Sequence, residues 1–212
     1  GLAGAYNGNV MRNAQRFIRD HGFDAKTIAV GRKGRDLLLR GGHELIAEFI
    51  DLPARPTETD VAPIARVAID TYLSHEVDSV YVAYTDFINV LSQEPIVRQL
   101  LPVQAGNPGS RVLSEYLHCD SPEHTNPYIY EQGYEELVNM IVPRFTALQL
   151  YQAILESLAS EHSARMVAMR NATQNADEIV GELTLSYNKA RQEAITTEML
   201  DIVGGAEALA AS

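Results

Sequence analysis

A stretch near the C-terminus, from Pro143 to Gly204, contains almost nothing that would interrupt a helix. Pro143 is the last of the nine prolines, and Gly181 is the one glycine between Gly133 and Gly204. Because proline breaks helices and glycine weakens them, this stretch predicts one continuous helix of roughly 60 residues and roughly 90 Å. Such a helix is far longer than the usual helix of a compact domain, so it must lie against a partner along much of its length.

The predicted helix carries an apolar seam whose members follow one another at steps of three or four, which keeps them on one side of the helix. The seam consists of Leu155, Leu158, His162, Arg165, Met169, Ala172, Ala176, Ile179, Leu183, Tyr187, Ala190 and Ala194. Several members are alanine, so a second helix could approach closely. The seam fits one strand of a coiled coil or a helix buried in a bundle, and the length of the stretch favours the coiled coil.

The part of the chain before this helix predicts alternating strands and helices, which is typical of an α/β layer fold. The predicted strands are 1–5, Thr27–Val30, Leu45–Ile50, Val80–Tyr84, Ile96–Val103 and Tyr128–Glu131. For Leu45–Ile50 a helix is the open alternative, and the strand is favoured. The predicted helices begin at an Asn7 or Asn9 cap, span Gly31–Gly41, and span Thr59–His75 with Thr59 or Asp60 as the cap. The last helix is expected to begin near Tyr134.

The expected fold class is therefore α/β: a Rossmann-like globular domain with a mostly parallel or mixed sheet, followed by a long C-terminal α-helix. The expected domains are residues 1–132 for the globular part and 133–212 for the helix.

Composition excludes several classes of function. The formal net charge of −11 argues against nucleic acid as a partner. No apolar run reaches the roughly 18–20 residues of a membrane span, and no signal peptide is visible. The single cysteine, Cys119, excludes a disulfide within the chain.

No arrangement of residues predicts a catalytic centre, a metal site or a cofactor site. His118, Cys119 and His124 are the one candidate metal cluster, but adjacent His and Cys rarely point at one ion and no fourth ligand is evident. The segment Gly31–Arg35 could bind an anion at a helix start, although a plain strand-to-helix turn with a solvated basic edge is the favoured interpretation. The start Gly1–Gly4 lacks the spacing of a phosphate-binding loop.

Three runs near the C-terminus are distinctive: Ser160–Thr173, Leu183–Gln192, and Ile195–Glu198 followed by Asp201 and Gly205–Ala208. Two more are the start of the chain, Gly-Leu-Ala-Gly-Ala-Tyr-Asn, and Val30–Gly34. Together these long ungapped runs resemble the γ subunit of F-type ATP synthases of the bacterial type. The first two are similar to the C-terminal helix of that family, the third to its closing signature, and the last two to its globular domain.

The resemblance implies a rotating shaft without a catalytic site of its own. Its partners would be the α3β3 hexamer of the synthase, the ε subunit and the c-ring, and it would couple proton-driven rotation to ATP synthesis or hydrolysis on the β subunits. It would need no cofactor and would lie peripherally at the cytoplasmic face of the bacterial cell membrane. With a single cysteine, the redox switch of chloroplast-type γ subunits is not expected.

The resemblance also implies roles for individual residues. Positions matching Arg165, Arg191, Gln192 and Thr196 contact the β subunits in the family, and positions matching Tyr128, Tyr130 and Glu131 belong to the foot near ε and the c-ring. Helical spacing alone would make the first four ordinary surface residues.

The family's N-terminal helix, which pairs with the C-terminal helix in a coiled coil, is not found in this sequence. The seam is therefore expected to drive self-association of the chain. Two alternatives remain open from the sequence: an unrelated coiled-coil adaptor with an α/β domain, and a small-molecule-binding α/β enzyme with a helical arm.

Overall fold

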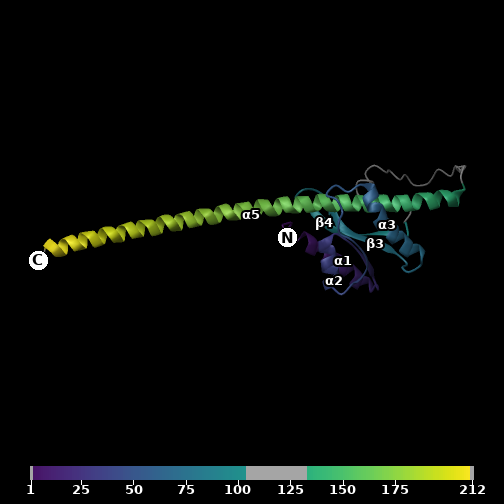
Figure 1. Ribbon diagram of the computed structural model, residues 1–212, viewed down its shortest axis with the longest axis horizontal. Helices are drawn as coiled ribbons and strands as arrows, with labels where there is room; N and C mark the ends of the chain where they lie inside the picture. The colour runs from purple at the N-terminus through teal and green to yellow at the C-terminus, as the bar shows by residue number, and fades with distance from the viewer. Residues whose placement is uncertain (1, 104–132, 211–212) are drawn as a thin grey trace. The chain divides into compact units, whose positions relative to one another are not determined.

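The structure, a computed structural model, describes residues 2–103 and 133–210 (Figure 1). The elements in chain order are α1 (Tyr6–His21), β1 (Lys26–Val30), α2 (Arg32–Arg40), β2 (Glu44–Phe49), α3 (Glu58–Leu73), β3 (Val80–Phe87), β4 (Gln93–Leu101) and α5 (Tyr134–Ala210). Contacts within the chain divide it into two compact units, Gly1–Arg165 and Met166–Ser212, so α5 belongs to both. The mixture of short strands, helices and a long final helix confirms the predicted α/β class.

Two small sheets, which share no strand, form the β part of the first unit. Strands β1 and β2 are parallel, with Val30 opposite Phe49, and α2 connects them as the crossover helix of a βαβ unit. Strands β3 and β4 form an antiparallel hairpin in which Phe87 lies opposite Gln93. The predicted parallel and antiparallel strands are thus both present.

The β3–β4 hairpin is longer than the sequence indicated, because its turn is closed by an asparagine. The Oδ1 atom of Asn89 accepts hydrogen bonds from the backbone N–H groups of Leu91 at 2.9 Å and Ser92 at 2.8 Å. These side-chain bonds add to the backbone hydrogen bonds between Asn89 and Ser92, and together they close the turn so that both strands continue up to it. Strand β3 therefore runs on to Phe87 instead of ending at Tyr84.

Two predictions about helix starts were wrong. Residues 2–5 form a turn instead of the end of a strand, because Gly4 has a φ of 59°, which reverses an extended chain. The cap of α1 is Ala5 and neither Asn7 nor Asn9. The cap of α3 is Thr57 and neither Thr59 nor Asp60. Asp60 instead completes the cap, since its Oδ2 accepts from the Thr57 N–H at 2.8 Å and from the Thr57 hydroxyl at 2.7 Å.

The long helix α5 begins at Tyr134, as expected, and continues beyond Gly204 to Ala210. Pro143 lies inside the helix without ending it. Proline removes the hydrogen bond to the carbonyl four residues earlier, that of Asn139. Both residues are exposed, so water can satisfy that carbonyl.

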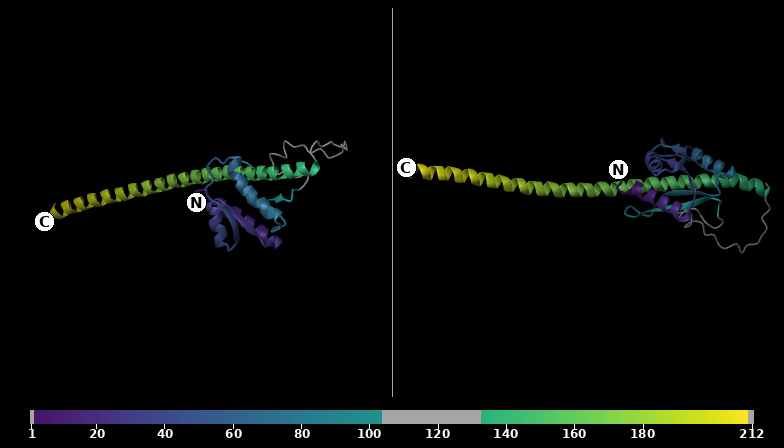
Figure 2. Two further views of the ribbon diagram at one scale, coloured as in Figure 1. Left: turned by 45° about the vertical axis from the view of Figure 1, so that its right-hand side comes forward. Right: turned by 90° about the horizontal axis from the view of Figure 1, so that it is seen from below.

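The core of the first unit lies where α3, the β3–β4 hairpin and the early turns of α5 meet (Figures 1 and 2). Its buried members are Val61, Ile64 and Ala65 of α3, Leu100 of β4 and Leu150 of α5. The three core residues of α3 recur at helical spacing, so this helix has one apolar side that faces the core. Since Leu150 is in this core, the first part of α5 is an integral part of the globular unit.

Because of this packing, the boundary between the two units lies within α5. The sequence predicted a boundary between 132 and 133, whereas contacts divide the chain after Arg165. The difference arises because the face of α5 that packs on the globular part continues from Thr146 to Ser160.

We call this face the docking face of α5, and it consists of Thr146, Leu150, Ala153, Ser157 and Ser160. Its members are four, three, four and three residues apart, which places them on one side of the helix. Thr146 and Ser160 are among the most completely buried side chains, at 1% and 0% exposed. The predicted seam follows a different side here, and Leu155 of that seam is 41% exposed.

Hydrogen bonds fix the docking face against β3 and the N-terminal turn. The Ser160 hydroxyl donates to the carbonyl of Thr85 at 3.2 Å. The Tyr6 hydroxyl donates to the Ser157 carbonyl at 2.8 Å and lies 2.6 Å from the Ser157 Oγ. Burial raises the pKa of Tyr6, and its bonds to Ser157 oppose that shift only in part.

We predict that Tyr6→Phe lowers the free energy of unfolding by about 1 kcal/mol, because the substitution leaves the Ser157 hydroxyl without its partner in a partly buried site. Tyr187→Phe is the matched control, since Tyr187 is 67% exposed, and it should change stability by less than about 0.5 kcal/mol. Urea unfolding followed by circular dichroism measures both values. Equal effects of the two substitutions would contradict the role given to Tyr6.

Candidate functional site

The candidate site residue in the first unit is Arg165, close to the end of that unit on α5. Its Nη2 atom forms an ion pair with Glu161 one turn earlier, and its Nη1 lies 3.3 Å from the Nδ1 of His162. The Arg165 side chain is 39% exposed. Exposed ion pairs of this spacing contribute about 0.3–0.5 kcal/mol to stability, so Glu161 orients the guanidinium of Arg165 but holds it only weakly. A guanidinium has five N–H donors, which leaves donors for a carboxylate on a partner.

The other three predicted contact residues, Arg191, Gln192 and Thr196, lie on α5 in the second unit and are exposed. Gln192 and Thr196 share one side of the helix, because they are four residues apart. The Thr196 hydroxyl donates to the Gln192 carbonyl at 2.8 Å. The Gln192 side chain therefore stands beside a hydroxyl that is already bonded to the helix.

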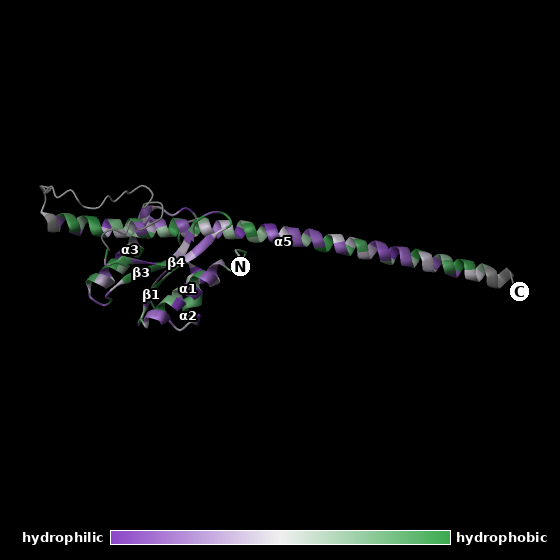
Figure 3. Ribbon diagram, turned by 180° about the vertical axis from the view of Figure 1, so that it is seen from behind, coloured by the Kyte–Doolittle hydropathy of each residue, from purple (hydrophilic) through white to green (hydrophobic). Residues whose placement is uncertain are grey.

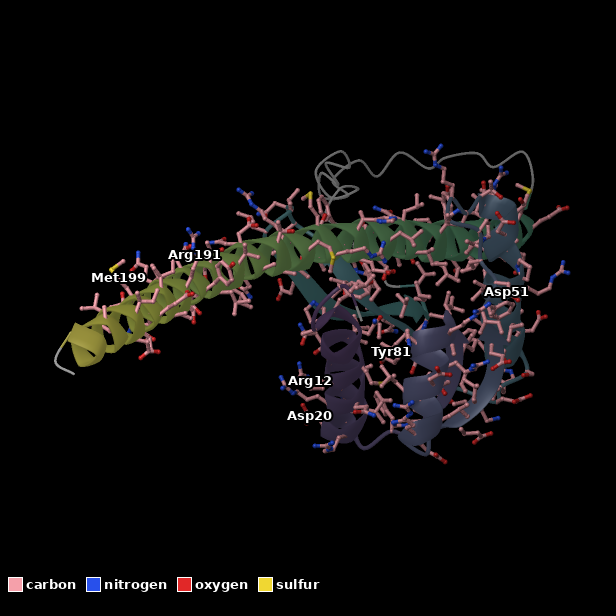
Figure 4. All side chains as sticks on the ribbon, turned by 60° about the vertical axis from the view of Figure 1, so that its left-hand side comes forward. Arg12, Asp20, Asp51, Tyr81, Arg191 and Met199 are labelled. Atoms are coloured by element: carbon pink, nitrogen blue, oxygen red, sulfur yellow. The ribbon has the colours of Figure 1, made fainter. Side chains whose placement is uncertain are left out.

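Arg191 points to a neighbouring side of the helix, about 100° around the axis from Gln192. Figure 4 shows its side chain projecting away from α5. Within residues 2–103 and 133–210 it takes part in no ion pair. Its charge is thus open to an acidic partner.

The remaining predicted positions cannot be placed. Tyr128, Tyr130 and Glu131, expected in the foot, lie outside the described residues, as do His118, Cys119 and His124 of the candidate metal cluster. Among the residues that the structure does describe, no group of His, Cys, Asp or Glu side chains is arranged to hold a metal ion. No described helix combines the length and apolar character that crossing a bilayer requires.

The segment Gly31–Arg35 has the plain structural role that the sequence favoured. Gly31 has a φ of 93°, a conformation that suits glycine, and α2 starts directly after it. Arg32 pairs with Asp51 at 3.3 Å, and Arg35 pairs with Asp36 at 2.9 Å. Two of its basic side chains are therefore engaged with neighbouring acids.

The second unit exposes more apolar surface than one seam accounts for. Large apolar side chains that are at least 40% exposed occur at Met166, Met169, Ile179, Val180, Leu183, Leu185, Tyr187, Ile195, Met199, Leu200, Ile202 and Val203. Consecutive residues lie about 100° apart around a helix, so the pairs Ile179–Val180, Met199–Leu200 and Ile202–Val203 reach beyond one side. Figure 3 shows hydrophobic stretches alternating with hydrophilic ones along the C-terminal part of α5.

A helix that is apolar on several sides is stable in water only when partners enclose it. Sequence reasoning found the seam and missed this wider distribution, although the consecutive apolar pairs were the signal for it. The second unit therefore exposes apolar side chains on several sides of one helix, and Arg191, Gln192 and Thr196 are exposed polar residues among them.

Comparison with known proteins agrees with this geometry. Residues 1–209 match the family model described as ATP synthase. A curated relative named ATP synthase gamma chain, from Dehalococcoides mccartyi, is 47% identical over 210 residues, which cover 99% of this chain and 70% of the relative.

The chain belongs to the ATP synthase gamma chain family.

Other members and solved structures extend this result. The ATP synthase gamma chain of Herpetosiphon aurantiacus is 47% identical over 218 residues, covering 99% of this chain and 70% of that protein. The central stalk and c-ring structure of the Tetrahymena thermophila mitochondrial ATP synthase contains a chain that is 26% identical to this one, with a TM-score of 0.61. The match covers 82% of this chain and 71% of that chain. A chain of the Euglena gracilis mitochondrial ATP synthase shares the fold, with a TM-score of 0.65, 21% identity and coverage of 99% and 69%.

Family membership also decides between the alternatives left open by the sequence. An unrelated coiled-coil adaptor and a small-molecule-binding enzyme would each require a different family, and a match over residues 1–209 leaves neither with support.

We predict that the isolated chain associates with itself in a concentration-dependent way, because the exposed apolar side chains of the second unit then cover one another. The double variant Leu183→Gln/Tyr187→Gln removes two side chains of the seam that are 63% and 67% exposed, and it should weaken the association. Sedimentation velocity over a range of concentrations measures this. Glu182→Gln is the control, and a wild-type chain that stays monomeric at every concentration would contradict the prediction.

Proposed function

We propose that this chain is the central-stalk rotor subunit of an F-type ATP synthase. In this function the C-terminal helix turns inside a ring of α and β subunits and presents a different side to each catalytic site in turn. The observation that carries the proposal is the exposure of apolar side chains on several sides of α5 after Met166, in a chain of the gamma family. A helix designed for one partner would need only one apolar side.

Rotation changes the catalytic sites through differential contact. A ligand or partner can shift an equilibrium only by as much as its contacts differ between the two states. The second unit has such differences, because the guanidinium of Arg191 and the amide of Gln192 lie on neighbouring sides of the helix. As the helix turns, each β subunit meets the charge and the amide in sequence.

The partners in this proposal are the α3β3 hexamer, the ε subunit and the c-ring, which makes the chain peripheral at the cytoplasmic face of a bacterial membrane. Arg165, Arg191, Gln192 and Thr196 are the proposed contacts with the β subunits. Tyr128, Tyr130 and Glu131 are the proposed foot contacts with ε and the c-ring. ATP is made and hydrolysed on β, so this chain couples the reaction and performs none of its bond-making steps.

The seam supports a further part of the proposal, a coiled coil in the assembled stalk. In the first unit the docking face of α5 packs on the globular part, whereas Leu155 of the seam is 41% exposed. The seam therefore lies open for a second helix on a side of α5 that the globular part does not use.

We predict that Arg191→Ala and Gln192→Ala, each placed in the complete rotor subunit and assembled with α and β subunits, lower coupled ATPase turnover. A hydrogen bond to a charged group contributes about 1.5–3 kcal/mol, so loss of one at Arg191 lowers turnover by about tenfold or more, and the neutral amide of Gln192 contributes less. Steady-state ATP hydrolysis measures turnover, and proton pumping in membrane vesicles measures its coupling.

Arg170→Ala is the matched control, because Arg170 is an exposed arginine of the same helix. It should leave turnover within about twofold of the wild type, which corresponds to about 0.4 kcal/mol. Wild-type turnover in both the Arg191 and Gln192 variants would contradict the contact roles of these residues. Failure of the wild-type subunit to assemble with the α and β subunits would contradict the rotor function itself.

A further inference from the structure

A half-buried glutamate of α5, close to the β3–β4 hairpin, has no part in the rotor contacts. Glu156 is on the flank of the docking face of α5. Its Oε1 accepts a hydrogen bond from the Gln152 amide at 3.1 Å. Its Oε2 is fully shielded from solvent and has no hydrogen-bond partner within the described parts of the chain. An ionised carboxylate with one oxygen buried and unsatisfied is unfavourable.

The hairpin surrounds this carboxyl group with both kinds of charge. The hollow beside it is lined by Tyr84, Arg98, Gln149 and Gln152. The guanidinium of Arg98 stands 5.9 Å from the centre of the Tyr84 ring, and Tyr84 is 5% exposed. Asp86, two residues further along β3, adds a negative charge close to Glu156.

These surroundings disfavour the charged form of Glu156. Burial is the largest cause and raises the pKa of Glu156, and the negative charge of Asp86 raises it further. The nearby Tyr84 hydroxyl, the bonded Gln152 amide and the charge of Arg98 lower the pKa of Glu156 again, without cancelling the shift. Burial also raises the pKa of Tyr84 to about 12, so this phenol keeps its proton throughout the physiological range.

The group sits at a joint of the first unit. Val80 and Val82 of β3 and Leu100 of β4 pack with Leu150 in the core, and the Ser160 hydroxyl bonds to the carbonyl of Thr85. Glu156 lies along α5 between these two fixed points. Any change in its charge therefore acts directly on the packing of the hairpin against the helix.

We propose that Glu156 is a proton-controlled latch between α5 and the β3–β4 hairpin, which closes when its carboxyl group takes up one proton from solvent and loosens when that proton leaves. Protonation removes a buried charge and turns the carboxyl group into a donor among the oxygens of Tyr84 and Asp86. This inference goes beyond the proposed function, since it concerns the stability of the first unit whether or not the chain rotates.

The sign of the pH dependence follows from the raised pKa of Glu156. An acid with a raised pKa in the folded state gives its full stabilisation below its ordinary pKa, near 4.3, and loses it as the pH rises through the folded value. Above that value the folded protein carries the buried charge. The latch is therefore closed in acid and open in base.

The test compares the intact chain with its Glu156→Gln variant, which keeps the shape of the side chain and removes the charge at every pH. Thermal unfolding is followed from pH 4.5 to pH 8. The variant should melt about 2–4 °C above the wild type at pH 8, and the difference should approach zero near pH 4.5. Glu178→Gln, an exposed position on the same helix, is the control and should show no such trend.

Hydrogen exchange of the hairpin reports the latch directly, once rates are corrected for the intrinsic effect of pH. In the wild type, protection of β3 amides should fall by about threefold or more between pH 4.5 and pH 8, whereas Glu156→Gln should hold it constant. A melting difference that does not vary with pH, or a variant less stable than the wild type at pH 8, would overturn the latch. If the variant does not fold, a carbon-13 titration of the wild-type Glu156 carboxyl decides, and an ordinary pKa refutes the proposal.

Discussion

The first unit depends on the small side chains that α5 presents to it. Ala153 and Ser160 are 4% and 0% exposed, and their size lets the β3–β4 hairpin approach the helix closely. Close approach brings backbone atoms of β3 within reach of side chains on α5, so the Ser160 hydroxyl can bond to the carbonyl of Thr85. A larger residue at either position would separate the two elements, because a packed interior has little room to adjust. The helix is thereby held by contacts that give it a fixed rotational setting on the globular part.

The two portions of α5 differ in what they bury, although both are parts of one helix. Up to Arg165 the helix buries a polar and small-sided face against its own chain, with Thr146 and Ser160 almost completely covered. From Met166 onward the described side chains include many apolar ones left in solvent, such as Leu185 at 75% exposed. The chemistry thus changes from anchoring within the chain to contact with other chains, and the change occurs beside Arg165.

Local signals in the sequence were sufficient for most elements of the fold. The absence of proline after Pro143 predicted a long helix, and the helix runs from Tyr134 to Ala210. The sequence could not show that Gly4 adopts a left-handed conformation, so residues 2–5 were assigned to a strand. The Asn89 turn was missed for a similar reason, because its hydrogen bonds depend on where the chain reverses.

Tertiary contacts explain the larger difference, which concerns the docking face. Three of the five members of the docking face are serine or threonine, so the spacing from Thr146 to Ser160 carried only a weak apolar signal. The seam beginning at Leu155 did carry that signal, and in the structure this residue remains 41% exposed. Apolar periodicity therefore identified a side of α5 that stays exposed within the chain, whereas the side that packs on the globular part was recognisable only from the structure.

The candidate contact residues were also not identifiable from local patterns. Resemblance to the family supplied Arg165, Arg191, Gln192 and Thr196, and helical spacing alone gave no reason to select them. The structure adds that their side chains lie on the surface of α5, where the backbone of the helix is already fully bonded. A surface position is what a contact residue requires, but many other exposed residues of α5 share it.

A helix that passes torque from a globular part to a ring must resist twisting at its anchor more strongly than at its contacts. The anchor here consists of dispersion contacts around Leu150 and hydrogen bonds from Tyr6 and Ser160. These interactions are neutral, so they vary little with pH or salt. Glu156 is the exception, since it is an ionisable group within the same joint and one of its oxygens is buried without a partner. Because charge in a buried joint opposes packing, the proton on this one carboxyl group sets how firmly the hairpin holds the helix. The stiffness of the anchor is therefore a property that solution pH can reach through a single side chain.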